Sequence, residues 1–219
     1  MKNFIILILC IYIGYLHHTY HNIKHKPITS EDVLKKINHN ISNIPIPDKH
    51  FNFNFVQTST ENEIEDDMVM DDSNFKIKSA HYAKLINKIF TPHQLKGLRE
   101  ILIMNCAEFD ANDTHELGEC VYDNEDCYVM LAGYAYKSDV MLNEVLFHEL
   151  CHVMQNSYMD EFNKIKDEWI KYDELYVSNY AETDIDEDFA ETGAHYLLGQ
   201  SHSNNPKFKL FEKFFNSIK

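Results

Sequence analysis

Residues 145–154, with the sequence VLFHELCHVM, constrain the fold of this chain more than any other segment. Glu149 is the one formally charged residue among these ten positions. An apolar run of this kind predicts a helix that packs inside the protein rather than on its surface. His148 and His152 lie within the run, so both histidines are expected to be buried beside a carboxylate. Buried polar groups need partners, and the pattern therefore indicates a built site rather than a passive core helix.

The spacing of the two histidines suggests what that site is for. His148 and His152 are four residues apart, which on a helix places both imidazoles on one face, where they can share a tetrahedral metal ion. Glu149 lies about 100° further round the helix. From there it can accept a proton from a water molecule and pass it to a leaving amine. The pattern H-E-x-x-H is typical of zinc peptidases; the alternative is an exposed helix with incidental histidines.

A third metal ligand has to come from another part of the chain. Metzincins continue with a glycine and a histidine, but Gln155 and Tyr158 occupy those positions here, which excludes that class. Downstream, Glu187 and Glu191 are four residues apart on a predicted helix and share a face. One can ligate zinc while the other orients a ligating histidine. From the residues alone, Glu187, Glu191 and His195 all remain candidates for the third ligand.

Two motifs resemble a known family. The segments FHELCHVM (147–154) and SNYAETDIDEDFAETGAHYL (178–197) are similar to the catalytic domain of anthrax lethal factor and related zinc peptidases. The resemblance extends by motif order from about Tyr128 to the C-terminus. It implies that Glu187 is the third zinc ligand and that Glu191 is a carboxylate that orients a ligating histidine without binding the metal. It also implies that Tyr180, seven residues before Glu187, helps to stabilise the oxyanion.

The chain also departs from that family. Asp188 stands where the family has an aromatic residue, and the segment between the two motifs is shorter than in lethal factor. The other large domains of that toxin have no room in 219 residues, so its choice of substrate does not transfer. Three further tyrosines are rivals for the catalytic role of Tyr180, namely Tyr172, Tyr176 and Tyr196.

The charge of the chain narrows the choice of partners. The formal net charge is −15, and a surface this acidic repels phosphates, so a nucleic-acid partner is not expected. Acidic residues are dense in the C-terminal third, for example at 184–188. Such runs usually form a solvated surface, and the alternative is a cleft that attracts basic peptides. A peptide or protein substrate, basic in the second case, is the expected partner.

The N-terminal third is expected to lie outside the catalytic domain. Residues 4–16 form an apolar stretch of about 20 Å, shorter than a membrane core of ~30 Å. Residues 1–25 are therefore predicted to be a signal peptide or a short membrane anchor with a histidine-rich flank, which implies the secretory pathway. Residues 26–75 are interpreted as a linker or stalk, with one short helix at 30–43 and an acidic run at 61–72.

Residues 76–219 are expected to form an α+β, minimal zincin-like domain. The HELCH helix would begin at a cap provided by Ser138 or Asp139 and pack on a small mixed sheet, and the C-terminal half would be mostly helical. The strand at 127–136 is expected to form an edge of that sheet, where an extended peptide could bind. Other helices are expected at 79–90, 91–105, 160–172, 184–198 and 206–217.

The cysteines offer one further structural expectation. Cys120 and Cys127 are close enough in the chain to be joined by a disulfide in an oxidising compartment, and Cys106 could pair with either. Sequence alone does not determine this connectivity.

Together these features predict a zinc-dependent endopeptidase in which His148, His152 and Glu187 hold Zn²⁺. The alternative is a secreted or membrane-tethered binding or structural protein whose zinc site is catalytically silent. Glu149 favours the enzyme, because a purely structural zinc site has no need of a general base. A zinc hydrolase acting on a non-peptide bond is a third possibility.

Overall fold

The computed structural model describes five segments of the chain, residues 53–57, 72–104, 117–123, 126–200 and 204–219. The predicted leader, the helix expected at 30–43 and Cys106 lie outside the described residues. Within the described segments, no helix is both long and apolar enough to cross a membrane.

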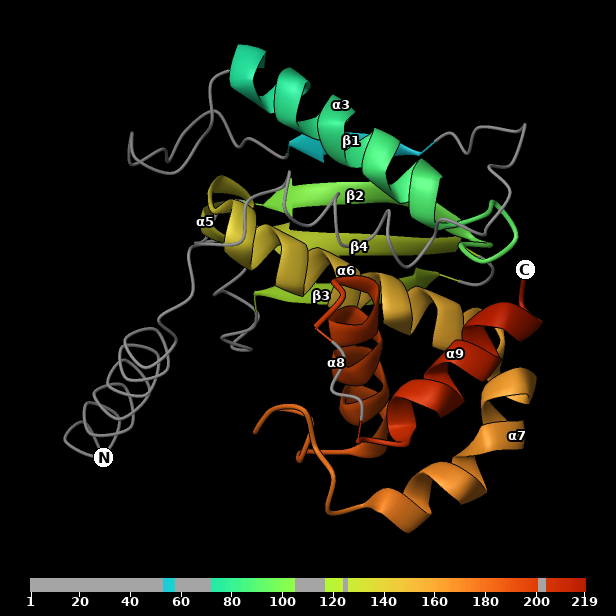
Figure 1. Ribbon diagram of the computed structural model, residues 1–219. Helices are drawn as coiled ribbons and strands as arrows, with labels where there is room; N and C mark the ends of the chain where they lie inside the picture. The colour runs from blue at the N-terminus through green and yellow to red at the C-terminus, as the bar shows by residue number, and fades with distance from the viewer. Residues whose placement is uncertain (1–52, 58–71, 105–116, 124–125, 201–203) are drawn as a thin grey trace, which may run out of the picture.

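A mixed four-stranded sheet forms the upper layer of the molecule (Figure 1). Its strands are β1 (Asn54–Gln57), β2 (Leu98–Met104), β3 (Gly118–Asp123) and β4 (Asp126–Ala132), and their spatial order is β1-β2-β4-β3. β1 and β2 are parallel, as are β2 and β4, whereas β3 runs antiparallel to β4. β3 is therefore an edge strand, with one row of backbone groups that does not pair within the sheet.

Two long helices cover one face of this sheet (Figure 1). They are α3 (Asp72–Ile89) and α6 (Asp139–Ser157), and the short helix α5 (Gly133–Lys137) joins β4 to α6. The Tyr82 hydroxyl of α3 donates to Asn143 Oδ1 of α6 across 2.9 Å in the buried interface. Most buried apolar side chains of both helices and of the sheet belong to one core.

The remaining helices form a lower layer below the sheet (Figure 1). They are α7 (Met159–Trp169), extended by a 3₁₀ turn (Ile170–Tyr172), α8 (Ile185–Leu197) and α9 (Lys207–Ser217). Phe189 of α8 is fully buried among the rings of α7 and α9, at centroid separations of 4.9 to 5.4 Å from Phe162, Trp169, Phe211 and Phe214. This aromatic cluster holds one face of α8 while the opposite face meets α6.

A buried ion pair links α8 to α9. Lys207 Nζ donates to Asp188 Oδ2 across 2.6 Å, and Trp169 Nε1 donates to the same oxygen across 2.7 Å. Neither charged side chain is more than 3% exposed. The ammonium also lies 4.5 Å from the ring centroid of Tyr176. Asp188, the departure from the lethal factor pattern, is thus accommodated by a cation from the next helix.

The α+β fold predicted from the sequence is confirmed. α6 begins at the expected cap, where Ser138 accepts a hydrogen bond from Met141 N, and it ends at Ser157 as expected. Helices α8 and α9 lie within one residue of the predicted positions, and α7 together with its 3₁₀ turn covers 159–172 against the predicted 160–172, which is within the usual uncertainty of helix ends.

The helix predicted at 91–105 is wrong. The capping signal is real, because Gln94 N donates to Thr91 Oγ1 and Thr91 N donates to Gln94 Oε1, but it serves only a turn. Gly97 then has a φ of 89°, which a helix does not tolerate. The following residues form β2, where pairing with strands on both sides outweighs local helix propensity.

Two other expectations about the sheet need correction. The strand predicted at 127–136 ends at Ala132 as β4. It is not an edge strand, because it lies between β2 and β3, and the edge on this side of the sheet is β3. Cys127, Val129 and Leu131 are buried and alternate with half-buried residues, which is typical of a strand that packs one face on the core.

Part of the segment interpreted as a linker belongs to the sheet. Residues 54–57 form β1, Phe53 is buried in the core, and α3 begins at Asp72. The alternating Phe and Asn residues there are thus a strand pattern of period two. The rest of the boundaries proposed at residues 25 and 75 stays a prediction.

Cys120 and Cys127 lie on neighbouring strands with their sulfur atoms 3.0 Å apart, and both are free thiols. They are adjacent, as the sequence suggested, and their disulfide stays a prediction.

Replacing Lys207 by Met should destabilise the protein by about 3 to 5 kcal/mol, because it leaves the buried carboxylate of Asp188 without its cation. The matched control is Lys164→Met, which removes an exposed pair with Glu161 and should cost less than about 1 kcal/mol. Urea unfolding followed by circular dichroism measures both. Equal effects of the two substitutions would contradict the buried pair described above.

Candidate metal centre

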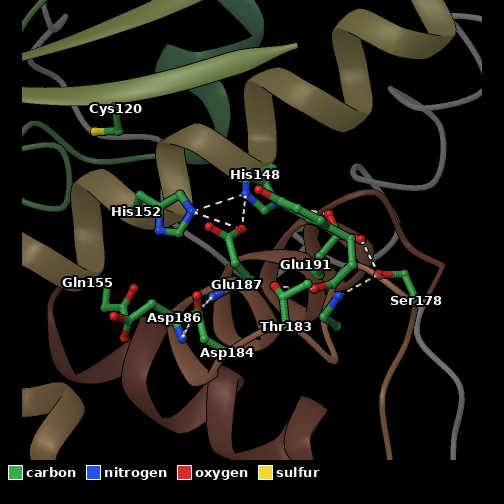
Figure 2. A network of polar contacts seen from close by, with 12 residues as sticks. Cys120, His148, His152, Gln155, Ser178, Thr183, Asp184, Asp186, Glu187 and Glu191 are labelled. Carbon is green, nitrogen blue, oxygen red and sulfur yellow. Dashed lines mark hydrogen bonds and ion pairs between the residues drawn. The ribbon is translucent and has the colours of Figure 1, made fainter. Parts of the chain in front are cut away.

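Two helices bring three potential metal ligands together. α6 carries His148 and His152, and α8 carries Glu187. His148 Nε2 lies 3.0 Å from His152 Nε2 and 3.0 Å from Glu187 Oε2, and His152 Nε2 lies 3.5 Å from the same carboxylate oxygen (Figure 2). One donor atom from each residue thus converges on a single point, all within 4.8 Å of one another.

The chemistry of these donors fits a zinc ion. Two imidazoles and one carboxylate are a donor set of catalytic zinc sites, which keep a fourth position open. Glu187 Oε2 is buried, and its contacts with the two imidazoles are ion-pair contacts that do not have hydrogen-bond geometry. Two ring nitrogens 3.0 Å apart can share at most one proton. A cation between these three atoms would satisfy all of them.

The electrostatics of the cluster point the same way. Burial alone would lower the pKa of His148, but its contacts with Glu187 and Glu191 outweigh burial and raise the pKa to about 10. Burial would raise the pKa of Glu187, yet the neighbouring His148 and His152 hold it at about 2. The carboxylates thus stabilise positive charge at this point, and zinc would compete with a proton for it.

A second carboxylate orients one of the histidines. Glu191 Oε1 lies 2.9 Å from His148 Nδ1, so this nitrogen donates its proton to Glu191 and Nε2 faces the cluster. The other oxygen, Oε2, accepts a hydrogen bond of 2.6 Å from the hydroxyl of Ser178. Neither Glu191 nor His195 contributes a donor atom to the cluster of three among the described residues.

The start of α8 holds Glu187 in place. Asp184 caps the helix, accepting hydrogen bonds from the backbone N–H groups of Asp186 and Glu187 at 2.8 and 2.9 Å. Gln155 of α6 then donates to Asp186 Oδ1 across 2.7 Å. The residue that excludes the metzincin pattern therefore ties the histidine helix to the start of the carboxylate helix (Figure 2).

Glu149 points into the same pocket and packs against the edge strand. Glu149 is 5% exposed, and the pocket is lined by His148, His152, Glu187 and residues of β3. A Cβ atom on Gly118 would lie 2.6 Å from Glu149 Oε1 and would collide with it. Glycine at this position is what lets the edge strand come so close to Glu149.

Tyr180 lies at the mouth of the pocket. Its side chain is 43% exposed, and its ring centroid is 5.8 Å from that of His148. The rival tyrosines lie elsewhere. Tyr176 donates to Asp173 and lies beside Lys207, Tyr196 packs on Phe211, and Tyr172 packs against the core.

Sequence reasoning missed three residues of this site. Gly118 and Ser178 contact Glu149 and Glu191 as described above, and the hydroxyl of Tyr122 donates to the carbonyl of His152 across 2.8 Å, which ties β3 to α6. Gly118 could have been noticed, because the chain has only six glycines. Ser178 and Tyr122 carry no pattern of their own, since each acts through a neighbour that is distant in the sequence.

Comparisons with known proteins add little to this geometry. Neither family models nor curated proteins match the chain. A solved structure from Bacteroides caccae, provisionally described as a zinc-binding metallo-peptidase, is similar over 90% of this chain and 86% of that one, with 15% identity and a TM-score of 0.37. A likeness at this level does not extend that protein's activity to this chain. The resemblance to lethal factor likewise stays a prediction from two motifs.

The cluster should bind about one zinc ion per chain, and Glu187→Gln should weaken binding by more than about 100-fold, because loss of even an outer partner costs 10- to 100-fold. The matched control is Glu119→Gln, which removes the same charge from the pocket wall without removing a donor of the cluster. It should change zinc affinity by no more than about fivefold. Competition with a chromophoric chelator measures both. A folded parent that binds no zinc, or equal losses in the two variants, would contradict this assignment.

Proposed function

We propose that this chain is a zinc-dependent endopeptidase. The observation that carries the proposal is the convergence of His148, His152 and Glu187, with the buried carboxylate of Glu149 in the same pocket. A zinc ion bound by the three residues would supply Lewis acidity, which lowers the pKa of water and polarises the scissile carbonyl. A structural site would need only the three ligands.

Glu149 would act as the general base and then as the general acid. Its carboxylate would accept a proton from the attacking water and deliver it to the leaving amine. Packing against Gly118 leaves this carboxylate little freedom to turn towards the edge strand. A fixed base of this kind reduces the reorganisation that the reaction would otherwise need.

Tyr180 would stabilise the oxyanion. Its hydroxyl is carried by a ring close to His148 at the mouth of the pocket, from where it could donate a hydrogen bond as charge develops on the carbonyl oxygen. Glu191 would take no part in bond breaking and would hold His148 in the orientation that ligation requires.

The expected substrate is an extended peptide. Among the described strands β3 is the edge strand beside the pocket, and a peptide could pair with the backbone on its outer side while its scissile bond lies over the cluster. Acidic side chains line this pocket, namely Glu119, Asp184 and Asp186 in addition to Glu149 and Glu187. Basic peptides are therefore the favoured class of substrate, and the sequences of the cleaved peptides will show whether basic residues are preferred.

Glu149→Gln should lower peptide hydrolysis by about 100- to 10,000-fold, the usual contribution of a general base, while zinc affinity stays near that of the parent. The assay incubates the zinc-loaded protein with a proteome-derived peptide library and identifies new termini by mass spectrometry. The control Glu168→Gln removes an exposed carboxylate from α7 and should cut like the parent. Equal cleavage by the parent and Glu149→Gln would contradict the role of Glu149 as general base. No cleavage by the zinc-bound parent would favour the alternative of a binding or structural protein whose zinc site is catalytically silent.

Tyr180→Phe should reduce kcat by about 100-fold, because a donor to the developing oxyanion acts mainly in the transition state. KM and zinc affinity should change little. Tyr176→Phe is the matched control, since that hydroxyl bonds to Asp173 outside the pocket. Both variants and the parent are compared by kcat and KM on one library peptide that the parent cleaves. A loss of zinc affinity in Tyr180→Phe, or an equal loss of kcat in Tyr176→Phe, would contradict the assigned role.

A further inference from the structure

We propose that Ser178 is a positioning residue whose single hydroxyl holds both the carboxylate that orients His148 and the turn that carries Tyr180. This inference rests on the proposed function and adds to it a residue that neither motif marks. Ser178 precedes α8 and lies next to Glu191 (Figure 2). It is not one of the three residues of the candidate ligand cluster.

The first contact of this hydroxyl fixes Glu191. The terminal torsion of a glutamate is broad, so one hydrogen bond from His148 does not by itself determine how the carboxylate is turned. Ser178 Oγ donates to Oε2 across 2.6 Å while His148 Nδ1 donates to Oε1 across 2.9 Å. Each oxygen then has its own donor. The plane of the carboxylate, and with it the ring of His148, is held from both sides.

The second contact fixes the turn around Tyr180. Ser178 Oγ accepts a hydrogen bond of 3.0 Å from the backbone N–H of Ala181, which is fully buried. This is a serine turn of the kind that replaces a backbone hydrogen bond. On the other side, Thr183 Oγ1 and Thr183 N both donate to the carbonyl of Tyr180, at 2.7 and 3.0 Å. Tyr180 is thus held on both sides by hydroxyl groups, but only that of Ser178 also reaches Glu191.

The hydroxyl of Ser178 has no second proton to donate. A hydroxyl has one proton to give and lone pairs to accept with. The proton goes to Glu191 and a lone pair goes to Ala181 N, so both functions depend on one atom. Alanine at 178 would lose both bonds, whereas threonine retains the hydroxyl and both bonds. Valine at 183 would remove the second hydroxyl of the turn without touching Glu191.

These contacts predict a specific pattern of effects in the full chain. Ser178→Ala should weaken zinc binding by about tenfold, the low end of the range for outer partners of a metal ligand. At saturating zinc it should also lower kcat by about tenfold through misplacement of Tyr180, with little change in KM. Ser178→Thr should restore both properties. Thr183→Val should lower kcat and leave zinc affinity unchanged.

The experiment measures zinc affinity by chelator competition, the visible absorption of the cobalt-substituted protein, and kcat and KM on one cleaved peptide. Urea unfolding of the metal-free variants establishes that each is folded. Weaker zinc binding and an altered cobalt spectrum in Ser178→Ala, reversed in Ser178→Thr, would support the inference without reference to turnover.

Other outcomes would overturn the inference. If Ser178→Ala keeps the zinc affinity and cobalt spectrum of the parent, Ser178 does not position Glu191, while the proposed function stands if Glu149→Gln is inactive. If Ser178→Thr fails to rescue a folded protein, the hydroxyl is not the relevant group. A parent that binds no zinc would overturn both the inference and the proposed function.

Discussion

The close approach of helices α6 and α8 is the constraint on which the candidate site depends. A Cβ atom at Gly193 would lie 2.6 Å from the sulfur of Cys151 and 2.4 Å from the ring of Phe211, so glycine is required where α8 lies between α6 and α9. On the side of α8 that faces α7 and α9, the aromatic cluster around Phe189 holds α8 against α6. Because Glu187 and Glu191 extend from this helix, a small shift of α8 would separate the carboxylates from the histidines.

Negative charge then defines what the site can hold. Glu149 and Glu187 line the pocket with the two imidazoles, and Glu191 contacts His148 from behind the cluster, so the mutual repulsion of three carboxylates has to be offset by positive charge. The raised pKa of His148 and the lowered pKa of Glu187 both result from this attraction between the carboxylates and the imidazoles. The acidic wall extends to β3 and to the start of α8. The same electrostatics thus favour a cation in the cluster and basic groups on a substrate.

Local patterns failed where pairing between distant segments decided the structure. Thr91 and Gln94 form the capping contacts that a helix start requires, yet the chain continues into β2 because strands from both sides pair with it. Such pairing is not visible in a window of ten residues. The Phe and Asn alternation before residue 58 was likewise a strand signal, but its partner lies more than forty residues further along the chain. The helices of the C-terminal half, and with them the α+β class, were predictable because each helix carries its own apolar period, and α6 and α8 also have capping side chains, Ser138 and Asp184.

The sequence by itself determined the chemistry available to this protein. The four-residue spacings of His148 with His152 and of Glu187 with Glu191 place each pair on one helix face wherever the helices lie, because helical geometry is local. Only the tertiary structure decided which residues meet. It brought Glu187 rather than His195 to the two imidazoles, set Glu149 against Gly118, and linked Ser178 to Glu191. Those contacts arise from the packing of distant segments against one another, and no spacing along the chain encodes them.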